Sequence, residues 1–158
     1  MDMERKTNHT DHVEQAEQFF LEGYNCSQSV MCAFSDVTGF DRPTSARLAS
    51  SLGGGMGRLR EVCGTVSAAL LVLGMACGYE DPKDMKAKKD HYLLVQDYAR
   101  RFREANGSII CRELLEGVKV KPGNVPEERT EEYYARRPCL NYVRRAAAIL
   151  DEMLGEKR

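Results

Sequence analysis

The sequence predicts an all-α protein, a single-domain helical bundle of about six to seven helices. Three observations support this prediction. Apolar residues recur at helical spacing along most of the chain, and no stretch shows the sustained alternation of apolar and polar residues expected of a strand. The length agrees, because 158 residues fit one compact domain with its own core. We expect a polar N-terminal tail over residues 1–10 and a cysteine-containing helical domain over residues 11–155.

Residues that start and stop helices predict three helices in the first third of the chain. The first covers about residues 11–22 and is followed by a glycine. The second begins at Asn25, a good N-cap, and ends before Gly39. The third opens at Pro43, since proline is tolerated in the first turn of a helix, and ends near Leu52.

The middle of the chain predicts a buried helix followed by a charged one. Residues 62–76 are apolar almost all round, which is typical of a helix at the centre of its domain. This helix contains Gly74, which costs about 1 kcal/mol relative to alanine unless close packing requires it. A long, highly charged helix follows from Pro82 to about Ala105.

The C-terminal part of the chain predicts a short helix, an exposed loop and a final long helix. The short helix covers residues 108–116. Residues 119–129 contain two prolines and a glycine and are expected to form the loop. The last helix covers about residues 138–154, with Pro138 at its first position.

Composition excludes several classes of function. The formal net charge of -1 argues against general nucleic-acid binding, which usually needs a basic excess. No segment approaches the roughly 18 apolar residues of a membrane-spanning helix, so no membrane partner is expected. Residues 1–18 are too polar for a signal peptide, so we expect a reducing cytoplasm. In that compartment six cysteines indicate metal binding or redox activity before structural disulfides.

Four of the six cysteines fall where a helix should begin. They are Cys26, Cys63, Cys111 and Cys139. The first turn of a helix presents unpaired N–H groups and the positive end of the helix dipole. Both favour a thiolate over a thiol, so cysteines at such positions tend to be reactive or to bind metals. Four of them together predict a sulfur-based site.

The chemistry of this site has three readings. Helix ends meet at the faces of a bundle, so Cys26 can meet Cys63, and Cys111 can meet Cys139. Four thiolates together suit zinc or an iron–sulfur cluster, with all four cysteines as metal ligands. Two pairs suit a dithiol/disulfide switch that needs no cofactor. In the plainest reading the thiols are small buried hydrophobic groups.

The other two cysteines, Cys32 and Cys77, are expected to pack in the core. Cys32 lies in an apolar stretch in the middle of a helix. Cys77 lies at the C-terminal end of the central helix, where the dipole disfavours a thiolate.

A glycine-rich loop precedes Cys63 and is a candidate ligand-binding segment. Its backbone amides can cradle an anion, with Arg58 or Arg60 supplying charge. Candidate cofactor-binding residues are therefore Gly54, Gly55, Gly57 and Arg58. The loop lacks the lysine and hydroxyl residue that end a P-loop. We favour a tight turn between helices that lets Cys63 approach a partner closely.

These motifs resemble a family of redox-active proteins named for its cysteine signature, C_GCAxxG_C_C. The resemblance covers about residues 16–154 and implies that the four helix-start cysteines form the family's cysteine set. It also implies redox activity, and related modules occur alongside haem or iron–sulfur electron carriers. The chain departs from the signature at Thr65, where the family has alanine, and at Ala68, where it has glycine. The matching stretches are residues 23–30, 52–57, 62–68, 106–115 and Cys139.

The leading hypothesis is a small cytoplasmic redox protein that works with a partner protein of unknown identity. A metal or iron–sulfur centre is slightly preferred over a dithiol switch, because a bound cation would offset the charge of four thiolates. The alternative is a non-catalytic helical interaction module with a structural four-cysteine zinc site or buried thiols. A homodimer is a further possibility. The sequence leaves open whether the protein is an enzyme, and an oxidoreductase and an electron carrier are the two candidates.

Overall fold

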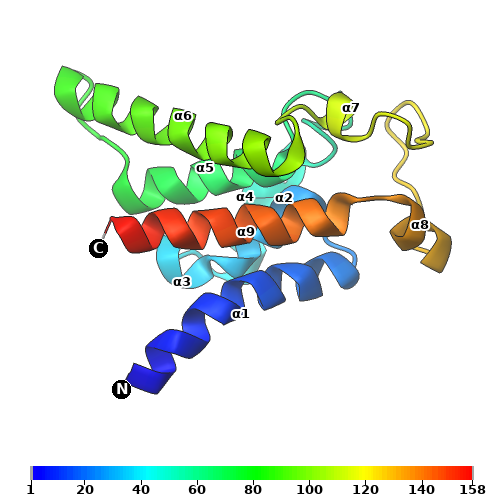
Figure 1. Ribbon diagram of the computed structural model, residues 1–158, viewed down its shortest axis with the longest axis horizontal. Coiled ribbons are helices and arrows are strands. Elements are labelled where there is room, and N and C mark those ends of the chain that lie inside the picture. Colours follow the sequence, from blue (N-terminus) through cyan, green and yellow to red (C-terminus); the bar gives the residue numbers. More distant parts are fainter. Residues whose placement is uncertain (1, 158) are drawn as a thin grey trace.

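A computed structural model describes residues 2–157 of the chain and the side chains of residues 12–157. Within that range the chain forms nine α-helices and no strands, so the prediction of an all-α single domain is confirmed (Figure 1). The expected polar tail over residues 1–10 lies outside the residues whose side chains are described. In chain order the elements are α1 (Asp2–Leu21), α2 (Cys26–Ala33), α3 (Ser35–Thr38), α4 (Arg42–Ala49), the 3-10 helix η1 (Ser50–Leu52), α5 (Gly64–Cys77), α6 (Met85–Asn106), α7 (Cys111–Leu114), α8 (Glu131–Arg136) and α9 (Cys139–Glu156).

The structure differs from the predicted helices at several ends. The helix expected to run from Asn25 to near Gly39 is broken at Phe34 into α2 and α3. The hydroxyl of Ser35 donates a hydrogen bond to the carbonyl of Cys32, which occupies that carbonyl where the helix is interrupted (2.8 Å). The backbone of α1 begins at Asp2 rather than near residue 11.

Two further differences lie in the second half of the chain. Helix α6 begins at Met85 rather than at Pro82, because the carboxylate of Asp84 caps it by accepting from the amide of Ala87. Helix α8 was not predicted. It starts where the hydroxyl of Thr130 accepts from the amide of Tyr133.

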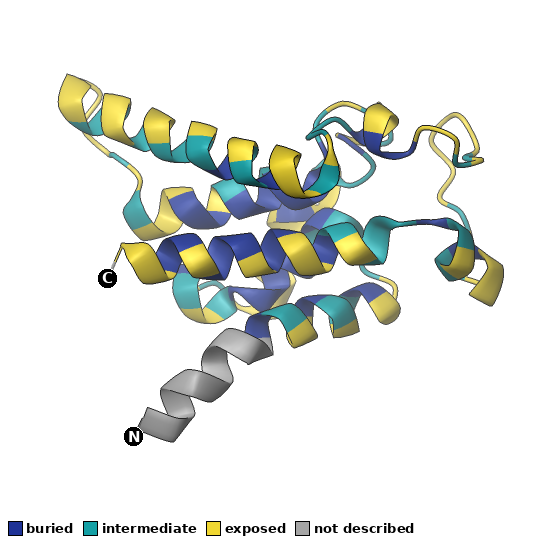
Figure 2. Ribbon diagram, viewed as in Figure 1, coloured by how far each residue is buried: buried dark blue, intermediate teal, exposed yellow. Residues whose placement is uncertain are grey.

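Helix α5 is the centre of the bundle. It packs against α2, α6 and α9, and its buried face is continuous with theirs (Figure 2). Helices α5, α6 and α9 lie side by side along the long axis of the molecule, while α1 packs against α2 and α9 (Figure 1). The fully buried Tyr98 of α6 donates its hydroxyl to the carbonyl of Ala146 in α9 (3.0 Å). Among the described residues, no helix is both long and apolar enough to cross a membrane.

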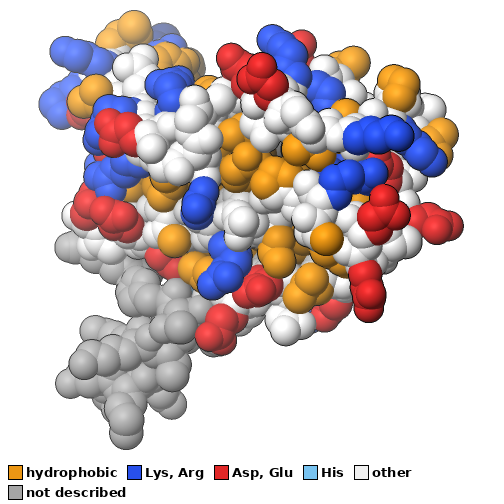
Figure 3. All heavy atoms as spheres, turned by 45° about the vertical axis from the view of Figure 1, so that its right-hand side comes forward, with side chains coloured by type: hydrophobic (Ala, Val, Ile, Leu, Met, Phe, Trp, Pro, Cys, Tyr) orange, Lys and Arg blue, Asp and Glu red, His pale blue; other side chains and the backbone are white. Residues whose placement is uncertain are grey.

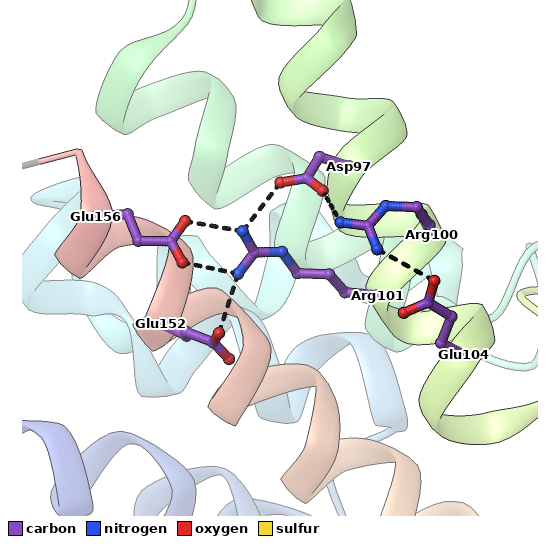
Figure 4. Close-up of polar contacts among 6 residues, drawn as sticks. All are labelled: Asp97, Arg100, Arg101, Glu104, Glu152 and Glu156. Carbon is purple, nitrogen blue, oxygen red and sulfur yellow. Dashed lines mark hydrogen bonds and ion pairs between the residues drawn. The ribbon is translucent and has the colours of Figure 1, made fainter.

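An ion-pair network joins the outer faces of α6 and α9. The guanidinium of Arg101 contacts Glu156 at 2.8 Å and Glu152 at 3.2 Å, and it also contacts Asp97 on its own helix (Figure 4). Arg101 is mostly buried while the glutamates are exposed, so the pairs are partly screened. The network joins the two helices along their outer faces.

A histidine between two carboxylates ties α1 to α3 and α9. The ring nitrogens of His12 lie 2.7 Å from Asp151 and 2.8 Å from Asp36, and the ring stacks on Phe34. Burial opposes the charged ring, but the hydrogen bonds to Asp151 and Asp36 outweigh it and raise the pKa of His12 above its usual value. The two carboxylates therefore favour the protonated ring, which can donate to both of them.

Replacing His12 with alanine is expected to lower the free energy of unfolding by about 2 kcal/mol, because two charge-assisted hydrogen bonds are lost. Since the folded-state pKa is raised, this contribution is fully present below the unfolded pKa and is lost as pH rises through the folded pKa. Urea unfolding at about pH 6 and about pH 9 measures the difference. His91→Ala, on α6 beside Tyr79, is the control. A His12→Ala effect that does not shrink at the higher pH would contradict the assignment.

Candidate functional site

The N-terminal ends of α2, α5, α7 and α9 meet at one end of the bundle, around a cavity of about 410 Å³. The four helix-start cysteines, Cys26, Cys63, Cys111 and Cys139, all line this cavity, and we call them the cavity cysteines. Figure 3 turns this end of the molecule forward and shows hydrophobic side chains, a class that includes cysteine, gathered beside basic ones. Cys32 and Cys77 are elsewhere and pack in or against the core.

Each cavity cysteine is placed by the local start of its helix. Cys26 is the first residue of α2, and Asn25 before it forms a capping box with Gln28. Cys63 is the N-cap residue of α5. Cys139 is the first residue of α9 and follows Pro138, which is the N-cap and not the first helical residue as expected.

A short antiparallel bridge brings the starts of α5 and α7 together. It pairs Val62 with Ile110. The amide of Cys63 donates to the carbonyl of Ile109 (2.8 Å), and the amide of Cys111 donates to the carbonyl of Glu61 (2.6 Å). Two segments far apart in sequence are thereby fixed with their cysteines at the same cavity.

The glycine-rich loop before Cys63 winds in the left-handed region. Five successive residues, 54–58, have φ between 55° and 70°, and two of them, Met56 and Arg58, are not glycine. A left-handed residue other than glycine costs roughly 1–2 kcal/mol, and strain of this kind concentrates at functional sites. The conformation is held by backbone hydrogen bonds such as that from Glu61 to Gly55 (3.0 Å).

The candidate loop residues lie in two places. Gly54, Gly57 and Arg58 line the cavity, and the amide of Gly54 donates to the sulfur of Cys26. Gly55 is buried behind them, where a Cβ atom would come within 2.8 Å of the Cβ of Cys111. The loop is therefore a turn packed closely on two cavity cysteines as well as part of the cavity wall.

Burial dominates the acid–base behaviour of the thiols. It raises the pKa of Cys26 to about 11 and that of Cys63 to about 12, and neighbouring cavity cysteines add to both shifts. Burial also raises the pKa of Cys139, but the Arg137 guanidinium, which hydrogen-bonds its sulfur, opposes that rise. Helix starts favour thiolates, yet here desolvation is the larger effect. These three thiols hold their protons at neutral pH.

Four arginines, which we call the cavity arginines, share the cavity with the thiols. The guanidinium of Arg60 donates to the sulfur of Cys111 (3.7 Å), and that of Arg137 donates to Cys139. Glu127 is the only acidic residue among the described residues of the lining. The cavity therefore carries a positive excess as long as the thiols are protonated. The cavity arginines are Arg58, Arg60, Arg129 and Arg137.

The sequence led us to expect that the cavity cysteines form a metal centre. Within the described part of the chain, no group of three or more histidine, cysteine or acidic residues is placed to hold a metal ion, and all six cysteines are free thiols. Ligand thiols must lose their protons to bind a metal, whereas burial keeps Cys26 and Cys63 protonated. The residues present do not form a ready metal site.

Sequence reasoning missed part of the lining. Thr65 lies two residues after Cys63, and its hydroxyl is 3.1 Å from the Cys63 sulfur. Arg129 crosses from the loop after α7, donates to the carbonyls of Phe20 and Tyr24, and stacks on aromatic rings. Thr65 and Arg137 each lie two residues from a cavity cysteine in the sequence, so this spacing could have identified them as site residues. No local pattern identifies Arg129, because the carbonyls that it contacts belong to α1 and to the residues just after α1.

Fold and site together define a class of protein, a small all-α protein whose thiols converge on a cavity lined with arginines. The chain belongs to the family described as "Putative redox-active protein (C_GCAxxG_C_C)", whose model matches residues 24–153. The resemblance seen in the sequence is thereby confirmed. Comparison with curated proteins and with solved structures gave no match.

Two glycines of α5 give a matched test of the packing around Cys26. A Cβ atom on Gly64 would lie 2.7 Å from the carbonyl oxygen of Leu52 and 2.8 Å from the Cys26 sulfur. Gly64→Ala is therefore expected to destabilise the protein by about 1–3 kcal/mol through overpacking. Gly74 is exposed on the same helix with no neighbour within 4 Å, so Gly74→Ala should stabilise it by up to about 1 kcal/mol. Urea unfolding measures both, and equal effects of the same sign would contradict the close approach.

Proposed function

We propose that the protein is a dithiol redox protein that exchanges disulfides through its cavity cysteines. The observation that carries this proposal is the convergence of four thiols on one cavity, two of them hydrogen-bonded by arginines. A buried thiol needs a nearby cation to become a nucleophilic thiolate, and guanidinium groups supply that charge. A second thiol close by is needed to complete exchange. Both requirements are met inside the same cavity.

Cys139 is the best candidate for the attacking thiol. It is half-buried on the cavity wall, whereas Cys63 and Cys111 are buried. Arg137 donates to its sulfur, and Arg129 adds a second positive charge nearby, so its thiolate is stabilised against the cost of burial. In the reaction the Cys139 thiolate attacks one sulfur of a substrate disulfide, forms a mixed disulfide and releases the other sulfur as a thiol.

A second cavity cysteine then completes the reaction. It attacks the Cys139 sulfur of the mixed disulfide, so that an intramolecular disulfide forms and the second substrate thiol leaves. The two protein thiols supply two electrons, and their protons end on the two released thiols. Cys111, Cys26 and Cys63 are the candidates, because each lies close enough for its charge to interact with that of Cys139.

The versions with a metal differ in what they require. An iron–sulfur cluster or a zinc ion held by the cavity cysteines would supply one-electron transfer or structural stability, respectively. Either would have to displace thiol protons beside the cavity arginines. The dithiol version uses the protonated thiols and the cavity arginines as they stand, and for this reason we rank it first. The non-catalytic interaction module with buried thiols predicts instead that no exchange occurs.

Cys139→Ser is expected to abolish disulfide exchange, because Cys63 and Cys111 are buried, and Cys26, which is half-buried like Cys139, has a pKa raised to about 11. Reduced protein is mixed with the aromatic disulfide dithiobis(nitrobenzoate), and the thionitrobenzoate that it releases is followed with time. Mass spectrometry after alkylation then locates the new intramolecular disulfide. Cys77→Ser, which changes a thiol outside the cavity, should react like the wild type. Wild-type exchange in the quadruple Cys→Ser variant would contradict the proposal, and so would iron with sulfide in protein purified without oxygen.

Alkylation of Cys139 is expected to speed up with pH. Its pKa is raised above the ordinary thiol value, so the thiolate fraction grows about tenfold per pH unit across the neutral range. Arg137→Gln should shift this profile to higher pH, because burial is then no longer opposed by the guanidinium. Iodoacetamide labelling with mass spectrometry measures the rate at each pH. A flat profile between about pH 6 and about pH 8 would show that the thiol is already ionised.

A further inference from the structure

Two of the cavity arginines are each paired with a cavity cysteine. The Arg60 guanidinium contacts the sulfur of Cys111 through Nη1, and the Arg137 guanidinium hydrogen-bonds the sulfur of Cys139. The two arginines come from different segments, one at the end of the glycine-rich loop and the other between α8 and α9. Both therefore place positive charge beside a sulfur on the cavity wall.

Both arginines also keep buried donors that have no acceptor among the described residues. These donors are Nη2 of Arg60, and Nε and Nη1 of Arg137. Arg137 as a whole is only 9% exposed. Its Nη1 lies 3.5 Å from the Glu127 carboxylate, beyond hydrogen-bond geometry, and that carboxylate already accepts from Arg136 at 2.7 Å. Buried donors without acceptors are rare in folded proteins and call for a specific explanation.

The other two cavity arginines are engaged by the protein itself. Arg58 donates to the carbonyls of Gly123 (2.9 Å) and Lys121 (2.6 Å). Arg129 donates to two carbonyls at the end of α1 and just after it, at 2.8 and 2.9 Å. These two hold the walls of the cavity in place. The unused donors therefore belong to the two arginines that touch sulfur.

We propose that Arg60 and Arg137 bind the carboxylates of a low-molecular-weight disulfide beside Cys111 and Cys139. This inference rests on the proposed disulfide exchange and names its substrate class. A guanidinium is well suited to a carboxylate because it presents paired donors in a fixed plane. The cavity volume of about 410 Å³ lies in the roughly 300–1,000 Å³ range of small-molecule sites. The positive excess of the lining selects for an anion.

Exchange with such a substrate follows the steps given above. The Cys139 thiolate attacks the substrate sulfur nearest Arg137, and the substrate S–S bond breaks as a new S–S bond forms. One half of the substrate leaves as a thiol with a proton from the protein. A second cavity cysteine then displaces the other half, and the protein is left oxidised by two electrons. The arginines hold the carboxylates and are positioning residues, since they take no part in the electron transfer.

Binding and exchange are measured separately with matched probes. S-methylglutathione carries the carboxylates but no reactive sulfur, and calorimetry reports its binding. Exchange rates are compared for glutathione disulfide, which is anionic, and cystamine, which is cationic. Wild-type protein should bind S-methylglutathione and react about tenfold or more faster with glutathione disulfide than with cystamine. Arg137→Gln and Arg60→Gln should each weaken binding about tenfold and reduce that preference.

Controls separate this inference from the proposed function. Arg144→Gln changes an arginine of α9 that faces Glu17 and not the cavity, so its binding and preference should match the wild type. Arg137→Lys keeps the charge and tests the loss of paired donors if the glutamine variant does not fold. Binding of S-methylglutathione without any exchange would overturn the disulfide chemistry but support the carboxylate site. Exchange at equal rates with both disulfides, unchanged in the arginine variants, would overturn this inference alone. Reaction with a protein disulfide but with neither small disulfide would overturn it in favour of a larger substrate.

Discussion

The bridge between Val62 and Ile110 is the constraint on which the cavity depends. It holds the starts of α5 and α7 in register through the amides of Cys63 and Cys111, although the long helix α6 lies between them in the chain. The left-handed loop before the bridge is forced to turn tightly, and its glycines allow the backbone to come against Cys26 and Cys111. Through this pairing, two cysteines that are far apart in the sequence line the same cavity.

Three electrostatic effects act on the cavity thiols, and their balance explains the site. Helix starts favour thiolates, burial disfavours them more strongly, and arginines restore part of the difference at particular sulfurs. Cys63 has Thr65 rather than a guanidinium as its side-chain partner, and its pKa of about 12 lies above the value of about 11 for Cys26. Cys139 has both Arg137 and access to the cavity. Equivalent positions at helix starts therefore give unequal reactivity, which a working dithiol requires.

Sequence reasoning located the cysteines but only part of their surroundings. Asn25 and Pro138 mark helix starts by local chemistry, so the helices that carry Cys26 and Cys139 were predictable. Apolar periodicity likewise identified α5 as the central helix. The break at Phe34 was not predicted, because apolar periodicity does not reveal that the Ser35 hydroxyl bonds the carbonyl of Cys32 at that point. The sequence predicted the charge of the glycine-rich loop but not Arg129 and Arg137, because these two come from segments that only the fold brings to the cavity.

Convergence of four helix starts has a consequence for the lifetime of the chain. The cavity cysteines come from segments far apart in sequence, so a disulfide between any two of them closes a long loop. Such a cross-link restricts the unfolded ensemble and favours the folded state. Proteases act on chains that open, so the oxidised form would be degraded more slowly than the reduced one. The oxidation state of the cavity would then be recorded in the abundance of the protein.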